Sequence, residues 1–381
     1  MNQQRVGVIG GGQLAWMMAL EAPGLEIELV VQTPSRHDPA VSLAQDVVLA
    51  PVDDAIATAE LAKTCSVITF ENEFVDLAAL KTLEAQGVCF RPSLANLAPL
   101  LDKFDQRSYL QHIGLPVPRF QPFDPQQPLP FDFPFVLKAR RYGYDGQGTY
   151  IIHNAEELTP LTPRLNAQDW LIEEFIPFER ELALMAARGV NGEVVLYPVV
   201  ETQQVNQVCH SVIAPAPITS ELQAEIANYA RLLLTKLQVV GIFGLELFLT
   251  PAGQVLVNEI APRTHNSGHY TLDACNLSQF AMQLQAVTGK TLQQPVLIGQ
   301  QAVMVNLLGY ENAQEDYAEK RAQLAAIPNA FVHWYNKSES RLGRKLGHVT
   351  VLLESGSASE ARSRETPASI IKKIENIWYF S

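Results

Sequence analysis

Two glutamates on neighbouring apolar segments have the residue type and spacing needed to bind a metal ion. They are Glu246 and Glu259, on the predicted strands Ile242–Leu249 and Gln254–Ile260, which a Thr-Pro-Ala-Gly turn joins. If this turn closes a tight hairpin, Glu246 faces Val257, and Glu259 lies two residues further along on the same face. Paired carboxylates repel unless a cation lies between them, and Mg²⁺ binds one or two carboxylates together with substrate phosphates. The pattern therefore predicts a Mg²⁺ site, with a solvated strand face as the alternative.

A polar run follows the second predicted strand directly and has the composition of an anion-binding loop. Residues 261–269 contain one arginine, two histidines, an asparagine and a serine. Such a run is too polar for a core segment, and an arginine binds carboxylates and phosphates through charge-assisted hydrogen bonds. We therefore expect an anionic substrate at this loop, beside the predicted metal site.

A lysine at the end of a predicted strand precedes a glycine-rich loop. Lys138 closes the apolar segment that begins at Phe135, and glycines follow at positions 143, 146 and 148, together with two arginines. Mobile glycine-rich backbone can close over phosphates, while a lysine can pair with their oxygens. The combination favours a nucleotide-phosphate loop over an ordinary structural turn.

A second glycine-rich turn, Gly10-Gly-Gly-Gln-Leu-Ala15, fits the pattern GxGxxA between a predicted strand and a helix. This turn can present backbone N–H groups to a phosphate at the helix N-terminus. A dinucleotide, however, needs an acidic residue at the end of the next strand, and this chain has Gln32 there. Three interpretations stay open: a dinucleotide site, a phosphate site for another ligand, and a tight turn that packing alone requires.

Two weaker patterns fit either ligand binding or an ordinary surface. Residues Glu173 to Ile176 end a predicted strand, and Glu181 follows. Such a hinge can read an adenine edge and accept from ribose hydroxyls, but surface glutamates are also common. A basic cluster near the C-terminus either binds a substrate phosphate or forms a solvated surface. The cluster comprises Lys337, Arg341, Arg344, Lys345 and His348.

The composition is that of a soluble globular protein with an acidic surface. The 381 residues suffice for two or three domains, with 47% apolar and 18% charged residues. The net charge of -12 argues against nucleic acid and anionic membranes as partners. No segment reaches the ~20 uninterrupted apolar residues of a membrane helix. The four cysteines lack metal-site spacing, which predicts reduced thiols and a cytoplasmic location.

The order of predicted elements places these motifs on a mixed scaffold. Parallel strands at 5–9, 27–31, 47–49 and 67–70 alternate with helices at 13–21 and 54–63 in a doubly wound unit. Seven prolines between Pro116 and Pro134 predict a linker. Beyond it we expect strands at 135–138, 149–153, 170–175, 181–187, 194–202, 242–249 and 254–260. Further helices are expected at 103–113, at 220–237 (capped by Ser220) and at 277–287, and a mobile loop at 355–366.

Several of these motifs occur together, and in the same order, in one enzyme family. The chain resembles the N5-carboxyaminoimidazole ribonucleotide synthetase family of the ATP-grasp superfamily over about residues 5–352. The most specific match is Asn258-Glu-Ile-Ala-Pro-Arg263 followed by His265-Asn-Ser-Gly-His269. The other matching segments are Gly10–Ala15, Phe70-Glu-Asn-Glu73, Gly143-Tyr-Asp-Gly146, Phe178-Glu-Arg-Glu181, His333-Trp-Tyr335 and Gly343-Arg-Lys-Leu-Gly-His348.

The resemblance implies an ATP-grasp fold of mixed α/β and α+β class. Its implied parts are a Rossmann-like pre-ATP-grasp domain (1–100), an ATP-grasp domain (101–300, with a lid at about 116–190) and a small β-rich C-terminal domain (301–381). The implied reaction is the ATP- and bicarbonate-dependent carboxylation of 5-aminoimidazole ribonucleotide in purine biosynthesis, which releases ADP and phosphate. ATP and Mg²⁺ are the implied cofactors, and a homodimer is the implied assembly.

The family's functional residues are carried over to the matching positions. Those implied to bind ATP are Lys103, Lys138, Gly143, Tyr144, Asp145, Gly146, Gln147, Gly148, Thr149, Glu173, Glu174, Phe175, Ile176, Glu181, Gln204, Asn258 and Glu259. Those implied for the ribonucleotide and bicarbonate are Glu73, Tyr144, Arg263, His265, Asn266, Ser267, Lys337 and Arg344. Glu246 and Glu259 are the implied metal ligands, and the implied catalytic residues are Asp145, Arg263, His265 and Lys337. The chain departs from the family's usual residues at Gln147, Thr149 and Gln204.

The implied mechanism begins with bicarbonate attacking the γ-phosphoryl group of ATP to give carboxyphosphate. The exocyclic amine of the ribonucleotide then attacks, with Asp145 as the candidate proton acceptor. The rival interpretations are a formate-using glycinamide ribonucleotide enzyme, a biotin carboxylase, an NAD-dependent dehydrogenase and a nucleotide-binding regulator without turnover. The segments at 265–269 and 333–335 oppose the first two, Gln32 opposes the third, and the intact Lys138 and acidic pair oppose the last.

Overall fold

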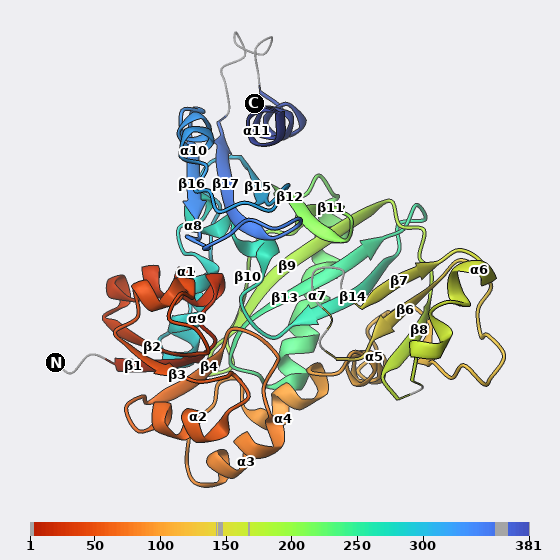
Figure 1. Ribbon diagram of the computed structural model, residues 1–381, viewed down its shortest axis with the longest axis horizontal. Coiled ribbons are helices and arrows are strands. Elements are labelled where there is room, and N and C mark those ends of the chain that lie inside the picture. The colour runs from red at the N-terminus through yellow and green to blue at the C-terminus, as the bar shows by residue number, and fades with distance from the viewer. Residues whose placement is uncertain (1–3, 142, 144–147, 167, 355–364, 381) are drawn as a thin grey trace.

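The computed structural model describes residues 4–141, 143, 148–166, 168–354 and 365–380, which form three β-sheets flanked by helices (Figure 1). In this view the N-terminal sheet lies at the lower left and a small antiparallel sheet lies at the right. The largest sheet runs between them and continues upward into the C-terminal part of the chain. Within the described residues, no helix is long and apolar enough to cross a membrane.

The N-terminal sheet has four parallel strands in the order β3-β2-β1-β4. Their bounds are β1 (Gln4–Ile9), β2 (Ile27–Thr33), β3 (Asp46–Leu49) and β4 (Val67–Phe70). The predicted doubly wound unit is confirmed, because helices α1 (Gln13–Glu21), α2 (Ala55–Ala62) and α3 (Leu77–Ala85) alternate with these strands. The side chain of Asp54 accepts from two N–H groups of the first turn of α2, so α2 begins one residue later than expected.

The small antiparallel sheet has the order β5-β8-β6-β7. Its strands are β5 (Phe120–Pro122), β6 (Phe135–Ala139), β7 (Thr149–Ile152) and β8 (Trp170–Glu174), and the short helix α6 (Ala155–Leu158) follows β7. The proline-rich stretch was predicted to be a linker without a long helix; it has no long helix but also contributes β5, which pairs with β8. A proline is tolerated there because β5 is an edge strand.

The largest sheet has nine strands, in the order β14-β13-β9-β11-β12-β15-β17-β16 with β10 paired to β9. Their bounds are β9 (Arg180–Arg188), β10 (Val194–Leu196), β11 (Val200–Val205), β12 (Val208–Ala214), β13 (Gly241–Leu249), β14 (Val255–Ala261), β15 (Gln301–Leu308), β16 (Ala330–Trp334) and β17 (Lys345–Leu353). The predicted single strand at 194–202 is two strands, because Pro198 interrupts the pairing between them. Pairing of β12 with β15 makes the sheet continuous across residue 301.

Helices on both faces explain the unbroken apolar run of β9. Leu182, Leu184 and Ala186 pack against α7 (Ser220–Leu237), while the alternate residues between them pack toward α9 (Gln279–Thr288). The N-cap of α7 is Thr219 and not Ser220 as predicted, because the Thr219 hydroxyl accepts from Leu222 N at 3.3 Å.

Helix α9 joins the largest sheet to the N-terminal sheet. Its Met282 and Ala286 face the largest sheet, and Phe280 and Leu284 pack with the apolar residues of β1, β2 and α1. Gln283 accepts from Ile242 N at 2.7 Å and donates to Thr69 Oγ1 at 2.7 Å. One buried helix therefore fixes the relative position of two sheets that contribute to the site.

The remaining helices are short, apart from the last. They are α4 (Leu94–Leu97), α5 (Lys103–His112), α8 (Thr271–Ala274), α10 (Ala318–Ala325) and α11 (Pro367–Phe380), with 3₁₀ turns η1 (Pro23–Leu25), η2 (Pro39–Ser42), η3 (Ala98–Leu100), η4 (Thr162–Arg164) and η5 (Asn266–Gly268). Helix α11 packs beside β15, where Trp378 is 1% exposed and its Nε1 donates to Leu308 O at 2.8 Å. Residues 355–364 of the predicted mobile loop lie outside the described residues.

Truncating the buried indole should destabilise this end of the sheet. We expect Trp378→Ala to lower the free energy of unfolding by about 3–5 kcal/mol, because it leaves a cavity and an unpaired carbonyl. Phe380, two residues later, is 81% exposed, so Phe380→Ala should cost less than about 0.5 kcal/mol. Urea denaturation of both variants measures the difference. Equal losses would show that α11 does not dock through Trp378.

Candidate active site

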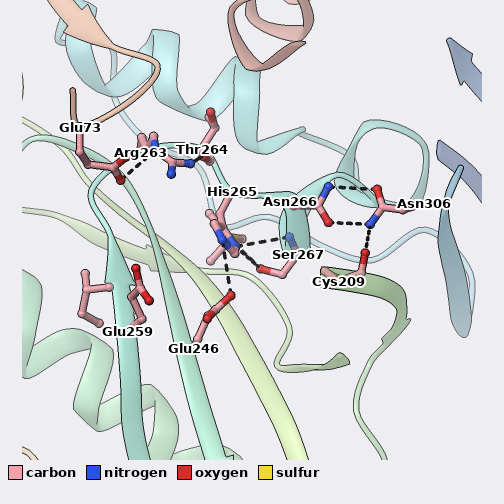
Figure 2. Close-up of polar contacts among 12 residues, drawn as sticks. Glu73, Cys209, Glu246, Glu259, Arg263, Thr264, His265, Asn266, Ser267 and Asn306 are labelled. Atoms are coloured by element: carbon pink, nitrogen blue, oxygen red, sulfur yellow. Dashed lines mark hydrogen bonds and ion pairs between the residues drawn. The ribbon is translucent and has the colours of Figure 1, made fainter. Parts of the chain in front are cut away.

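The hairpin of β13 and β14 places Glu246 and Glu259 directly opposite each other. The expected register was wrong: Leu247 pairs with Val257, and Glu246 pairs with Glu259. Asn258 is the extra residue of a β-bulge at this point. The bulge moves Glu259 into cross-strand contact with Glu246, and Figure 2 shows the two carboxylates side by side on neighbouring strands.

The two carboxylates share one half-buried space and do not ionise alike. Burial, and then the negative charge of Glu259, raise the pKa of Glu246 to about 7. For Glu259, the charge and hydrogen bond of Lys103 outweigh burial and lower the pKa. Glu181 on β9 joins the group, since burial and then Glu246 raise its pKa to about 7. Crowded carboxylates with raised pKa values fit a divalent cation, which would remove their repulsion.

Two lysines from different elements reach the acidic pair. Lys103, the first residue of α5, places its Nζ 2.5 Å from Glu259 Oε2. Lys138 on β6 donates to Asn258 Oδ1 at 3.0 Å and to Glu173 Oε2 at 2.8 Å. The small sheet and α5 thus bring positive charge to the edge of the acidic hairpin. This combination suits a polyphosphate, whose oxygens can bridge the lysines and a cation.

Glu173 holds the buried cations of the site. Its side chain is 3% exposed, and its two oxygens contact Arg107 Nε and Lys138 Nζ. Burial alone would raise the pKa of Glu173, but the charges of Arg107 and Lys138 lower it to about 2. Glu174, the next residue of the predicted adenosine pocket, is part-buried and pairs with Arg119, whose Nε lies 2.6 Å from Glu174 Oε2. Phe175 and Ile176 follow directly after β8.

The glycine-rich loop is described only at its ends. Tyr144, Asp145, Gly146 and Gln147 lie outside the described residues. Gly148 has φ +76°, and a Cβ there would lie 2.9 Å from Ala139 Cβ, so the turn into β7 requires glycine. Gly143 is described without regular structure, and Thr149 begins β7 opposite Lys138. Gln204 lies on β11 beside a register shift, opposite Cys209.

The polar run after β14 turns back toward the acidic pair. Arg263 Nε lies 2.9 Å from Glu73 Oε1, and His265 Nε2 lies 3.5 Å from Glu246 Oε1. The other ring nitrogen of His265 lies 2.9 Å from Ser267 Oγ. These contacts, drawn in Figure 2, bring residues from three parts of the chain to one place beside the carboxylates. An arginine and an imidazole next to a metal site suit an anion that reacts there.

Three residues that sequence reasoning missed hold this loop. The Gln279 side chain accepts from His265 N at 2.9 Å and donates to His265 O at 2.7 Å. Asn306 exchanges two hydrogen bonds with Asn266, of 3.0 and 2.7 Å. Gly244 on β13 leaves room for His265, because a Cβ there would lie 2.8 Å from His265 Cβ. Asn306 had a visible signal, a polar residue inside an apolar strand, whereas Gln279 and Gly244 had none.

The basic cluster of the C-terminal part is divided between surface and core. Lys337 Nζ donates to Gln13 Oε1 at 2.8 Å and to Lys345 O at 2.6 Å, next to the start of α1. Arg344 is part-buried and donates to Glu339 O at 2.9 Å. His348, however, is fully buried, and burial lowers its pKa far below the usual value. The expectation that His348 adds to a positive surface was therefore wrong.

His348 also belongs to a group with Asp273 and His333, whose geometry does not suit a metal ion. Asp273, His333 and His348 place possible ligand atoms within 4.8 Å of one another. The rings of His333 and His348 are stacked, with centroids 4.6 Å apart and planes at 16°. A shared ion must lie in the plane of both rings, which stacked rings prevent. Instead, His333 Nε2 bonds to Asp273 at 2.9 Å and links β16 to α8.

Comparison with known proteins identifies the class of this chain. A family described as the ATP-grasp domain matches residues 108–280. The ribonucleotide synthetase preATP-grasp domain matches residues 3–98, and the phosphoribosylaminoimidazole carboxylase C-terminal domain matches residues 302–362. Together with the acidic hairpin and the lysines beside it, these matches define an ATP-grasp ligase.

The relatives narrow the class to one family. An N5-carboxyaminoimidazole ribonucleotide synthase from Synechocystis sp. is 54% identical over 98% of both chains, and one from Synechococcus elongatus is 52% identical over 98% of this chain and 95% of its own. The chain belongs to the N5-carboxyaminoimidazole ribonucleotide synthase family. A solved ADP complex of such a synthetase is 32% identical and has a TM-score of 0.89 over 99% of this chain and 97% of its own.

A further solved relative contains a nucleotide and a ribonucleotide together. The synthase from Aspergillus clavatus, in complex with ADP and 5-aminoimidazole ribonucleotide, is 30% identical with a TM-score of 0.85 over 98% of this chain and 99% of its own. Full-length similarity to this family opposes the two rival ligases, the formate-using enzyme and biotin carboxylase.

The raised pKa of Glu246 gives a pH-dependent prediction. A carboxyl whose pKa rises from 4.5 to about 7 on folding contributes stability below its unfolded pKa and loses that contribution as pH rises through about 7. Glu246→Gln cannot ionise, so without metal it should exceed the wild type in stability by roughly 1–3 kcal/mol at pH 8 and by less at pH 6. Thermal denaturation in a chelating buffer measures this, with exposed Glu60→Gln as the control. A pH-independent difference would contradict the assignment.

Breaking the buried ion group should be costly. We expect Glu173→Gln to lower the free energy of unfolding by about 3–5 kcal/mol at pH 7, because Arg107 and Lys138 would keep their charges without a carboxylate. The lowered pKa implies that this stabilisation is fully present above pH 4.5 and is lost as pH falls through about 2. Equilibrium unfolding in urea at pH 7 provides the measurement. A loss below about 1 kcal/mol would mean that Glu173 does not hold these cations.

Proposed function

We propose that this chain uses ATP, Mg²⁺ and bicarbonate to carboxylate 5-aminoimidazole ribonucleotide to its N5-carboxy product, with release of ADP and phosphate. The observation that carries the proposal is the convergence of Glu246 and Glu259 with Lys103 and Lys138 on one side and with Arg263 on the other. The bound ligands of the solved relatives, ADP and the ribonucleotide, support it. The pathway is purine biosynthesis, to which the family belongs.

The phosphate end of ATP would lie along the acidic hairpin. Lys103 and Lys138 offset the charge of the polyphosphate, and Asn258 holds the Lys138 ammonium in place through a 3.0 Å hydrogen bond. Glu246 and Glu259 would hold Mg²⁺, which would supply positive charge against the phosphate oxygens. The glycine loop, Gly143 to Thr149, would cover the phosphates and exclude water.

The adenosine end would lie beyond β8. We assign it to Glu174, Phe175, Ile176, Glu181 and Gln204, as the resemblance implies. Glu173 would act on ATP indirectly, because its oxygens are already used by Arg107 and Lys138. By holding the ammonium group of Lys138, Glu173 would keep it within reach of the ATP phosphates.

Carboxyphosphate would be held between Arg263 and His265. Glu73 contacts Arg263 Nε at 2.9 Å and Thr264 O accepts from Nη1 at 3.1 Å, so the guanidinium is fixed and Nη2 would be the donor that reaches the anion. Ser267 holds the Nδ1 side of the His265 ring at 2.9 Å, while Nε2 lies 3.5 Å from Glu246 Oε1 and would be the donor that faces the anion. Asn266 contributes by its paired bonds to Asn306, which hold the turn. Such prepositioned donors stabilise the charge that develops on the carboxyl oxygens.

The ribonucleotide would enter from the C-terminal side of the site. Lys337 and Arg344 would bind its phosphate, and the exocyclic amine would then point toward Arg263. Tyr144 and Asp145 belong to the glycine loop, and Asp145 is the proposed acceptor of the amine proton. Neither is among the described residues.

We further propose a homodimer located in the cytoplasm. The four cysteines are free thiols, as expected in a reducing compartment. Light scattering coupled to gel filtration tests the assembly directly. A mass of one chain would contradict the dimer.

The reaction itself is tested by ADP release. With bicarbonate and Mg·ATP present, ADP should form rapidly when 5-aminoimidazole ribonucleotide is added and only slowly without it. Omitting Mg²⁺ should abolish the ribonucleotide-dependent rate. ADP formation that does not respond to the ribonucleotide would overturn the proposal.

Arg263→Ala should abolish carboxylation without unfolding the chain. Loss of a donor set that stabilises transition-state charge costs about 10²–10³ in turnover, and kcat should fall more than KM for ATP rises. The exposed Arg36→Ala serves as the control and should keep wild-type rates. Turnover by Arg263→Ala within a few-fold of the wild type would remove Arg263 from the mechanism.

A further inference from the structure

The glycine turn that resembles a dinucleotide site is filled by a carboxylate of the protein itself. Glu71 follows β4 and is 7% exposed. Its Oε2 accepts from Gly12 N at 2.7 Å, and its Oε1 accepts from Leu14 N at 3.0 Å and Ala15 N at 3.3 Å. These N–H groups open α1 and have no acceptor within the helix. Glu71 therefore occupies the position that a phosphate takes in dinucleotide-binding turns.

The glycines of the turn make room for this carboxylate. Gly10 has φ +124°, and a Cβ there would lie 2.4 Å from Glu71 Oε2. A Cβ at Gly12 would lie 2.6 Å from Glu71 Oε1. Gln32, where a dinucleotide site needs an acid, is fully buried and bonds to Thr58 and Pro51. Glu71 therefore takes three N–H groups that a phosphate would need, which favours the packing interpretation of this turn.

The residues on either side of the contact between Glu71 and the glycine turn bond to residues of the proposed site. On the helix side, Gln13 lies between the bonded N–H groups and accepts from Lys337 Nζ at 2.8 Å. On the strand side, Glu73 follows Glu71 by two residues and contacts Arg263 Nε at 2.9 Å. Lys337 comes from the C-terminal part and Arg263 from the loop after β14. One buried carboxylate therefore fixes the distance between the residues that orient Lys337 and Arg263.

We propose that Glu71 is a positioning residue that holds the phosphate-binding side of the ribonucleotide pocket, through Gln13 and Lys337, in register with the reacting side, through Glu73 and Arg263. This inference rests on the proposed function of that pocket. The Glu71 side chain bonds to Gly12, Leu14 and Ala15, none of which is proposed to bind ATP, so its loss should affect ribonucleotide binding selectively. A glutamine is a poor replacement, because its NH₂ group would meet a backbone donor where the carboxylate offers an acceptor.

The test compares Glu71→Gln and Glu71→Ala with Asp54→Ala, a matched control in the same N-terminal part of the chain. Asp54 also caps a helix by accepting two backbone N–H bonds, from Ile56 at 2.9 Å and Ala57 at 3.1 Å, but the elements on which α2 mainly packs, α3 and β1 to β3, carry no proposed site residue. We expect both Glu71 variants to raise KM for 5-aminoimidazole ribonucleotide by about tenfold or more, with KM for ATP changed less than about twofold. Asp54→Ala should lower the melting temperature while leaving both KM values near those of the wild type.

Rescue by a small carboxylate separates positioning from general damage. Glu71→Ala leaves a cavity at a helix N-terminus, where acetate can accept the freed N–H bonds. Tens of millimolar acetate, against chloride of the same ionic strength, should raise the melting temperature of Glu71→Ala and lower its ribonucleotide KM, and should change neither quantity in Asp54→Ala. If Glu71→Ala does not fold even in acetate, Glu71→Gln decides through its ratio of KM values.

The outcomes distinguish this inference from the function on which it rests. Unchanged ribonucleotide KM in the Glu71 variants, equal increases in the Asp54 control, or equal increases in both KM values would each overturn the positioning role. Failure of the wild type to respond to the ribonucleotide would instead overturn the proposed function. The acetate effect on melting temperature can still be measured in that case, and it reports on the carboxylate cap alone.

Discussion

The repulsion between Glu246 and Glu259 is the constraint on which the site depends. A regular hairpin would have separated these carboxylates along the strands, but the bulge at Asn258 puts them opposite each other. The chain leaves this repulsion only partly relieved, since Lys103 lowers the pKa of Glu259, whereas burial and then the charge of Glu259 keep the pKa of Glu246 raised. A cation that binds between the two carboxylates would remove their repulsion. The relieved repulsion would add to the binding free energy and so increase the affinity for the metal.

Around the acidic pair, carboxylates on one element contact arginines or lysines on another. Glu173 contacts both Lys138 and Arg107 in the interior, Lys103 contacts Glu259 at the edge of the hairpin, and Glu73 contacts Arg263 on the loop after β14. Lys103, Lys138 and Arg263, the cations proposed to face ATP or carboxyphosphate, are therefore each held by a carboxylate. Little reorganisation is then needed when substrates bind, which is the condition under which fixed dipoles and charges lower a barrier most.

Sequence reasoning reached the elements and the residue types but not the contacts that set their geometry. The parallel strands, α7 and the acidic hairpin follow from local patterns, because apolar periodicity and turn residues act over a few positions. The bulge at Asn258 does not, since the extra residue is accommodated by hydrogen bonds from Lys138 and Arg107, which lie over a hundred residues away in the chain. Glu71 lies in the segment 70–73 that matches the family, but only the fold shows that its side chain fills the glycine turn. Gln279 gave no signal, because a glutamine in the first turn of a helix is ordinary.

The continuous pairing of β12 with β15 has a consequence for how the chain can be divided. The last eighty or so residues carry Lys337 and Arg344, yet their sheet is completed by a strand that belongs to the preceding segment. A fragment cut at residue 301 would leave an unpaired strand edge on each piece, and such edges recruit other chains. Gene fusions, split reporters and module exchange within this family should therefore place their junctions outside the strand pair, because a border drawn by sequence homology runs through the middle of a single hydrogen-bonded surface.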